Sequence, residues 1–198
     1  MSDILLISSS FFGYAKEIKR ALETQGRPVH WFEDRPATDN LTKAMIRVAP
    51  SLISRRADAH FTEVIRQMAG RPITDVLVIK GEALSPDMIR QMRAAFPSAR
   101  FTLYFWDSYL NMPADTPQKV PLFDRVLSFD PVDSRADARL AYRPLFYLNE
   151  YARLSDSPTD DIDLLFIGTV HTDRYAVLNR LKAALPAEMR FERVLFFP

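Results

Sequence analysis

Short apolar runs recur along the first three quarters of this chain, and each of them ends in polar residues or glycine. Five such runs can be recognised, at residues 3–7, 29–32, 75–79, 101–105 and 125–129. Unbroken apolar stretches of this length are typical of parallel strands that are buried on both faces. Because amphipathic segments separate them, the pattern predicts an α/β fold with a Rossmann-like, doubly wound parallel sheet.

The segments between these runs carry apolar residues at helical spacing. Ser85 and Pro86 give the clearest helix start, because serine caps an N-terminus and proline suits the first helical position. The other helices are expected from residue 14 to a stop near Gly26, at roughly 41–49 and 56–69 on either side of Pro50, and at 131–138, before a small sixth strand at 141–143.

A second strand–helix–strand pattern follows a polar linker. We therefore expect a first domain over 1–147, a linker over 148–160, and a second Rossmann-like domain over 161–198 that is incomplete. A βαβ unit cannot bury both faces of its sheet alone. The expectation is that more chain follows Pro198 or that the unit leans on the first domain. The apolar residues at 194–197 leave a homodimer open.

The composition excludes several classes of function. The 26 basic and 25 acidic residues give a net charge of +1, so nothing favours a nucleic-acid partner. The chain has no cysteine, which excludes disulfides and cysteine-ligated metals. No segment has the roughly 18 uninterrupted apolar residues of a membrane span, and the N-terminus carries no secretion signal. We expect a cytoplasmic protein, with peripheral membrane association left open.

Several common catalytic and nucleotide-binding motifs are missing from the sequence. It contains no GxGxxG, GxxxxGK[ST], GxSxG or HExxH. These absences argue against a dinucleotide cofactor, a P-loop NTPase, a serine hydrolase and a zinc peptidase.

Ligands bind beyond the carboxyl ends of the strands in an open parallel sheet, so the residues that follow each run are the candidates for a site. Those candidates are Gly13 after the first run, Lys80 and Glu82 after the third, and Trp106 and Asp107 after the fourth. Each has a structural alternative: a tight turn at Gly13, an ion pair between Lys80 and Glu82, and a core aromatic beside a helix-capping Asp107. A tryptophan next to a carboxylate also suits a sugar or a base, through stacking and hydrogen bonds to hydroxyls.

Two aspartates follow the fifth run. Asp130 and Asp133 could hold a divalent ion, but Asp133 is expected to cap the short helix instead. We therefore predict no metal site.

In the second unit, the strand is followed by residues that suit an anion: Gly168, Thr169, His171 and Arg174. They stand at a helix N-terminus, where backbone N–H groups and the helix dipole favour negative charge, so Thr169 and Arg174 could hold a diphosphate. His171 is the best candidate for a titratable group that acts in catalysis or contacts phosphate. The alternative is that Thr172 or Asp173 caps the helix and Arg174 is solvated.

Seven sequence segments, in order along nearly the whole chain, resemble segments of the proteins of one family. They are SSSFFGYAKEI, WFEDRP, DVLVIKGEALSPDMI, LYFWDSYLNMP, FDRVLSFDPVD, RPLFYLNEY and DLLFIGTVHTDRYAVL. With these strings the chain resembles bacterial glycosyltransferase-like proteins related to a spore-maturation protein. Such proteins belong to capsule, exopolysaccharide and lipopolysaccharide biosynthesis.

The resemblance implies a metal-independent GT-B glycosyltransferase, whose N-terminal domain takes the acceptor and whose C-terminal domain takes the nucleotide-sugar donor. It implies a donor-diphosphate site at Gly168, Thr169, His171 and Arg174. It places Gly13, Lys80 and Trp106 on the acceptor side. Asp107 or Glu82 is then the base for the acceptor hydroxyl, with a pKa raised in a closing cleft. No cofactor is expected beside the nucleotide-sugar and a saccharide or other hydroxyl acceptor.

Two other interpretations stay open. If the second domain is truncated, we expect this chain to be inactive alone. As a separate alternative, the chain is a non-catalytic Rossmann-type module that binds a nucleotide, a sugar or a protein partner. A receiver-like signalling domain fits less well, because a receiver has an acidic cluster after its first strand and this chain has three serines there.

Overall fold

A computed structural model describes residues 2–35, 50–148, 161–170 and 173–197 of the chain. The chain divides into two compact units, Met1–Phe146 and Tyr147–Pro198, and each is described by itself. No helix in the described ranges is long and apolar enough to cross a membrane.

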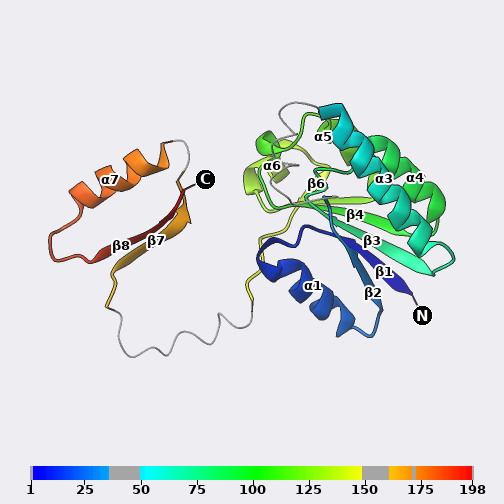
Figure 1. The fold of residues 1–198 in the computed structure, drawn as a ribbon, viewed down its shortest axis with the longest axis horizontal. Helices are drawn as coiled ribbons and strands as arrows, with labels where there is room; N and C mark the ends of the chain where they lie inside the picture. The colour runs from blue at the N-terminus through cyan, green and yellow to red at the C-terminus, as the bar shows by residue number, and fades with distance from the viewer. Residues whose placement is uncertain (1, 36–49, 149–160, 171–172, 198) are drawn as a thin grey trace. The chain divides into compact units, whose positions relative to one another are not determined.

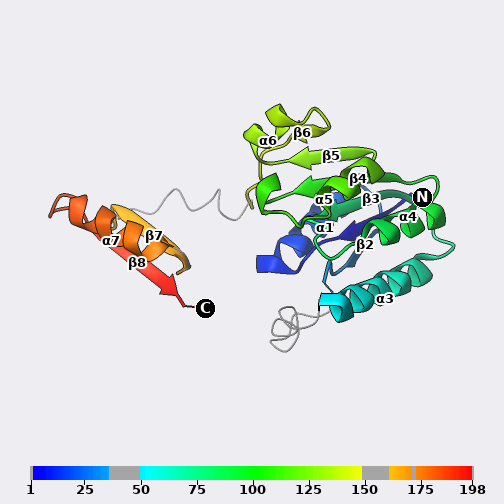
Figure 2. The ribbon, with the colours of Figure 1, turned by 90° about the horizontal axis from the view of Figure 1, so that it is seen from above.

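The first unit is built on a six-stranded sheet in which every neighbouring pair is parallel, in the order β2-β1-β3-β4-β5-β6 (Figures 1 and 2). Its strands are β1 (Asp3–Ile7), β2 (Val29–Phe32), β3 (Ile73–Ile79), β4 (Arg100–Phe105), β5 (Arg125–Ser128) and β6 (Leu140–Tyr142). The predicted Rossmann-like α/β class is therefore confirmed.

Helices alternate with these strands. They are α1 (Tyr14–Glu23), α3 (Pro50–Met68), α4 (Pro86–Ala95), and the short α5 (Thr116–Lys119) and α6 (Pro131–Ala136). The predicted start of α4 is confirmed, because the Ser85 hydroxyl accepts a hydrogen bond from the Met88 amide at 3.2 Å. The helix predicted at 56–69 is already present at Pro50, since a proline in the first turn leaves no required hydrogen bond unmade. The helix predicted at 41–49 lies outside the described residues.

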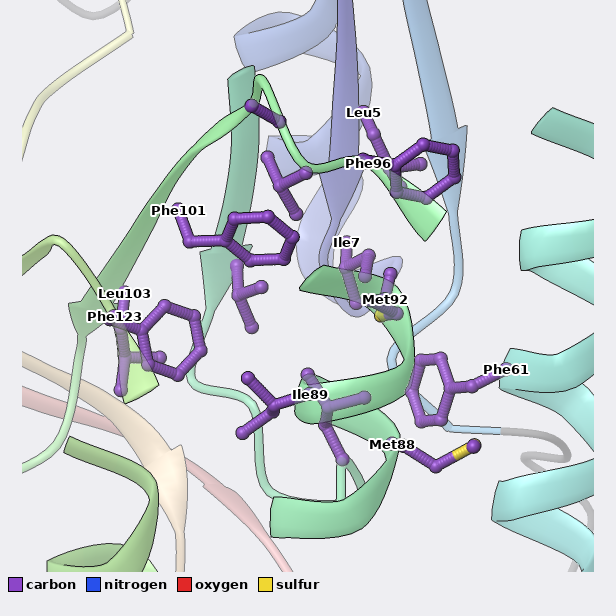
Figure 3. Packing of buried hydrophobic residues seen from close by; sticks show 14 of the residues in the cluster. Leu5, Ile7, Phe61, Met88, Ile89, Met92, Phe96, Phe101, Leu103 and Phe123 are labelled. Atoms are coloured by element: carbon purple, nitrogen blue, oxygen red, sulfur yellow. The ribbon is translucent and has the colours of Figure 1, made fainter. Parts of the chain in front are cut away.

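Alternating residues of the central strand β1 serve two hydrophobic cores. Leu5 and Ile7 point into the larger core, which α3 and α4 complete, while Ile4 and Leu6 point into a smaller core beside α1. A strand with both faces covered must be apolar throughout, which is why the sequence run is unbroken. In the larger core Phe61 projects from α3 towards Met88 and Met92 of α4 (Figure 3).

The second unit contains a parallel pair of strands and one helix: β7 (Leu164–Thr169), α7 (Arg174–Ala184) and β8 (Phe191–Phe196). Burial alternates along both strands, and Leu178 of α7 is buried. The side chains on the opposite face of this strand pair are exposed and largely apolar, and they include Leu165, Ile167, Val194 and Phe196.

Candidate functional site at the carboxyl edge of the sheet

The turn after β3 lies where the order of the strands in the sheet changes direction: β2 is added on one side of β1, and β3 and the later strands on the other. β1 pairs with β2 on one side and with β3 on the other, so the β1–β3 boundary is a topological switch point. Ligands of open α/β sheets bind beyond the carboxyl ends of the strands at such a point. Residues Lys80, Gly81 and Glu82 therefore occupy the position that sequence reasoning assigned to a site.

Lys80 has a left-handed backbone, with a φ of 66°, and Gly81 follows with a φ of 64°. The Gly81 amide donates to the Ile79 carbonyl at 2.9 Å, which closes a three-residue γ-turn around Lys80. A lysine in this region carries steric strain that glycine would not, and such strain is typical of functional sites. Gly81 is also needed for space, because a Cβ there would approach the Val78 Cγ1 atom to 2.9 Å.

The side chains of this turn form a charged network with the turn after β4. The Lys80 ammonium lies 2.9 Å from a Glu82 carboxylate oxygen and 2.7 Å from an Asp107 oxygen. Glu82 also pairs with Arg35, which follows β2. The structure thus brings together Lys80, Glu82 and Asp107, three of the predicted site residues. Asp107 caps no described helix, since Ser108 occupies the N-cap position of the 3₁₀ turn Tyr109–Asn111.

Two buried charged groups bind the backbone of the same turn. Sequence reasoning missed both of them. The Lys119 ammonium donates to the Gly81 and Glu82 carbonyls at 3.2 Å each and pairs with Asp115 at 3.0 Å. The Asp34 carboxylate accepts a hydrogen bond from the Glu82 amide at 3.2 Å. Both side chains are almost fully enclosed, with Asp34 0% and Lys119 3% exposed.

The expectation that Glu82 has a raised pKa is wrong. Burial acts to raise it, but hydrogen bonds and charges from Lys80 and Arg35 outweigh that effect and leave the pKa of Glu82 lowered. Burial likewise acts to lower the pKa of Lys80, and its hydrogen bonds to Asp107 and Glu82 turn the net shift upward. Among the carboxyl groups that the structure describes, Asp34 is the one with a raised pKa, which burial brings to about 6.

Trp106 lies among other aromatic rings rather than standing free. Its ring centroid is 6.1 Å from those of Tyr14 and Tyr104 and 5.5 Å from that of Phe146. Its indole N–H is buried and has no hydrogen-bond partner in the described part of the chain. Trp106 therefore packs as a core aromatic, as its structural alternative predicts, and also has an indole N–H donor without a partner among the described residues.

Gly13 occupies a left-handed position, with a φ of 77°, at the N-cap of α1. Open space surrounds the place where its Cβ would lie, so conformation alone explains the glycine. The preceding Phe12 is also left-handed, with a φ of 47°, and its ring is 76% exposed. Rings from Phe12 through Tyr14 to Trp106 make successive edge contacts, which places Gly13 beside an aromatic surface.

The two aspartates after β5 have roles opposite to those expected. Asp130, not Asp133, caps α6, because its carboxylate accepts from the Val132 amide at 2.7 Å. Asp133 accepts instead from the Tyr109 amide at 2.7 Å and so ties α6 to the turn after β4. No group of three or more histidine, aspartate or glutamate side chains among the described residues could hold a metal ion.

In the second unit, Gly168, Thr169 and Arg174 lie together at the end of β7. Arg174 donates to the Thr169 carbonyl at 2.8 Å, and its guanidinium carbon lies 5.8 Å from the centre of the Phe166 ring. A Cβ at Gly168 would approach that ring to 3.0 Å, so glycine leaves room for it. His171 lies outside the described residues, and the donor-site roles of these residues remain predictions.

Comparison with solved structures gives a similar fold. MurG from Acinetobacter baumannii, a GT-B glycosyltransferase, is 11% identical, and the match covers 99% of this chain and 68% of that one with a TM-score of 0.54. A pilus assembly-related protein from Burkholderia pseudomallei is 18% identical over 70% of this chain and 92% of its own, with a TM-score of 0.34. No family model matches the chain, and no curated protein matches it in sequence. At this level of identity the likeness to MurG shows a GT-B-like fold alone.

Proposed function

We propose that the chain is a glycosyltransferase, or the greater part of one, that transfers a sugar from a nucleotide-sugar to a hydroxyl acceptor in bacterial surface polysaccharide assembly. The acceptor binds at the carboxyl edge of the first unit, beside Lys80, Trp106 and Gly13. The donor diphosphate binds the second unit, at Gly168, Thr169, His171 and Arg174. No metal takes part, because helix N–H groups and Arg174 balance the charge of the leaving diphosphate.

One observation carries this proposal: on a GT-B-like fold, Lys80 bridges Glu82 and Asp107 from a strained turn at the topological switch point. Of the two carboxylates, we assign Asp107 as the base toward an acceptor hydroxyl, because its side chain is 45% exposed and pairs with Lys80, whereas that of Glu82 is 22% exposed and pairs with both Lys80 and Arg35. Glu82 is held ionised by Lys80 and Arg35, and a lowered pKa makes it a weak proton acceptor. Glu82 then holds Lys80 in place while Asp107 receives the proton.

A second candidate function is a non-catalytic module that binds a nucleotide or a sugar. It is favoured by the way Arg174 is satisfied within its own unit, through the Thr169 carbonyl and the Phe166 ring. An arginine that serves a diphosphate must give up at least the first of these contacts when the ligand binds.

Calorimetry with UDP, GDP, ADP and CMP tests the donor site, and an assay of nucleotide release then distinguishes the two functions. We expect one nucleotide to bind and Arg174→Ala to weaken binding roughly tenfold or more, as loss of a charge-assisted hydrogen bond should. Arg180→Ala, at an exposed position of the same helix, is the matched control and should bind as the native chain does. The chain that binds is then given the matching nucleotide-sugars and assayed for release of the nucleotide, with and without Asp107→Asn. Binding without release, in the presence of a range of saccharide acceptors, supports the module instead, and equal binding by Arg174→Ala contradicts the donor site.

A further inference from the structure

Lys119 is a buried charged residue that has no role in the proposed chemistry. Its side chain is 4% exposed, and burying an ammonium group is unfavourable unless partners replace water. An ammonium has three N–H donors. Here the Gly81 and Glu82 carbonyls accept hydrogen bonds at 3.2 Å each, and the Asp115 carboxylate lies 3.0 Å from the ammonium as an ion-pair partner.

Both hydrogen bonds that the Lys119 side chain donates within the described part of the chain go to the strained turn. The two carbonyls that it holds follow directly after the left-handed Lys80, and the Glu82 amide between them is held by Asp34. Asp34 and Lys119 thus bind the backbone of the turn, while the Lys80 side chain pairs with Glu82 and Asp107. If those hydrogen bonds were lost, Lys80 could relax to the ordinary backbone region and its ammonium would move away from Asp107.

We propose that Lys119 is a positioning residue for the candidate site, which holds the turn so that the Lys80 ammonium stays between Glu82 and Asp107. The significance of this for catalysis rests on the proposed function, whereas the positioning itself does not. Lys119 touches no proposed reacting group directly and acts on the Lys80 ammonium through the backbone of Gly81 and Glu82. A buried lysine in a purely structural role would stabilise the fold without changing the electrostatic surroundings of Lys80.

The test reads the Lys80 amine directly and needs no substrate. Lysine amines are labelled by reductive ¹³C-methylation, the Lys80 signal is assigned by its absence in Lys80→Arg, and its pH titration is followed by NMR. In the native chain the pKa of Lys80 should lie above its ordinary value, because two carboxylates surround it. In Lys119→Met, which keeps the aliphatic stem but donates no hydrogen bond, we expect that upward shift to be lost. Lys16→Met, at an exposed position of α1, is the control and should leave the titration unchanged.

A native-like Lys80 titration in a folded Lys119→Met chain overturns the proposal. Should that variant not fold, Lys119→Arg decides: it keeps the charge and donors for both carbonyls, so the Lys80 shift must persist, and its loss overturns the proposal. Nucleotide-sugar turnover is measured separately on the same variants. If the Lys80 titration changes as expected but no variant or native chain transfers sugar, the positioning stands and only the proposed function fails.

Discussion

Lys80 offers a test in which the sign of a stability difference, rather than its size, decides. At an ordinary position alanine stabilises a folded chain over glycine by roughly 0.5–1 kcal/mol, because glycine loses more backbone freedom on folding. Lys80, however, has a φ of 66°, and a side chain in that region costs roughly 1–2 kcal/mol. Both Lys80→Ala and Lys80→Gly lose the same ion pairs with Glu82 and Asp107. Only the glycine variant also loses the strain.

The difference between the two variants therefore isolates the backbone. Subtracting the entropic disadvantage of glycine from the relieved strain leaves Lys80→Gly more stable than Lys80→Ala by roughly 0–1.5 kcal/mol, with a central value of about 0.75 kcal/mol. With a urea m-value of about 2 kcal/mol/M, that central value places the midpoint about 0.4 M higher for glycine. Tryptophan fluorescence reports the correct unit, because both tryptophans, Trp31 and Trp106, belong to Met1–Phe146.

The control pair is Lys16→Ala and Lys16→Gly, within the exposed face of α1, where the order should be the usual one and alanine should be the more stable. If Lys80→Ala equals or exceeds Lys80→Gly while the control pair behaves normally, the turn is not strained. The interpretation of Lys80 as a residue held for function would then lose its main support.

Three further predictions concern the first unit. Because the pKa of Asp34 is raised from 3.8 to about 6, the folded chain binds this proton more tightly than the unfolded chain does. Ionisation of Asp34 therefore opposes folding, and its contribution to native stability should fall by about 3 kcal/mol between pH 4 and pH 7. Urea unfolding of Asp34→Asn should lack this fall, so a stability difference between the two chains that stays constant from pH 4 to pH 7 contradicts the raised pKa. Ser85→Ala should lower the free energy of unfolding by about 1 kcal/mol through loss of the α4 cap, whereas Ser98→Ala at an exposed position should change it little. Phe61→Ala should cost about 3–5 kcal/mol in the same measurement, because its ring is 0% exposed between α3 and α4, and a cost below 1 kcal/mol would show that this contact is not tightly packed.

The sequence was sufficient to predict the strands and helix starts that obey local rules. Unbroken apolar runs located the strands because β1, for example, must be apolar on both faces. The same rule that found Ser85 before Pro86 could have found the cap of α6, since Asp130 directly precedes Pro131. The contact that Asp133 makes instead, with the Tyr109 amide, is tertiary and leaves no local signal in the sequence.

The missed half of the site consists of residues whose importance depends on distant partners. Asp34 and Lys119 are separated from the turn that they hold by 48 and 37–38 positions in the chain. Nothing in the adjacent sequence distinguishes them from solvated charges. The left-handed conformation of this turn begins at Lys80, one residue before Gly81, where a side chain makes it costly.

The unfavourable features of the first unit converge on one turn, and this convergence is the strongest reason to place chemistry there. A left-handed lysine, an enclosed ammonium and an enclosed carboxylate each oppose folding when taken singly. Here the two enclosed groups both bind the backbone of Gly81 and Glu82, directly after the left-handed Lys80. Apolar side chains in place of Asp34 and Lys119 would leave the carbonyls and the amide of the turn without these partners. The position of the Lys80 ammonium between two carboxylates therefore depends on both groups. Paired replacement of Asp34 by leucine and Lys119 by methionine should therefore alter the Lys80 titration even if the global fold survives, and a folded double variant with a native Lys80 would show that the turn holds itself.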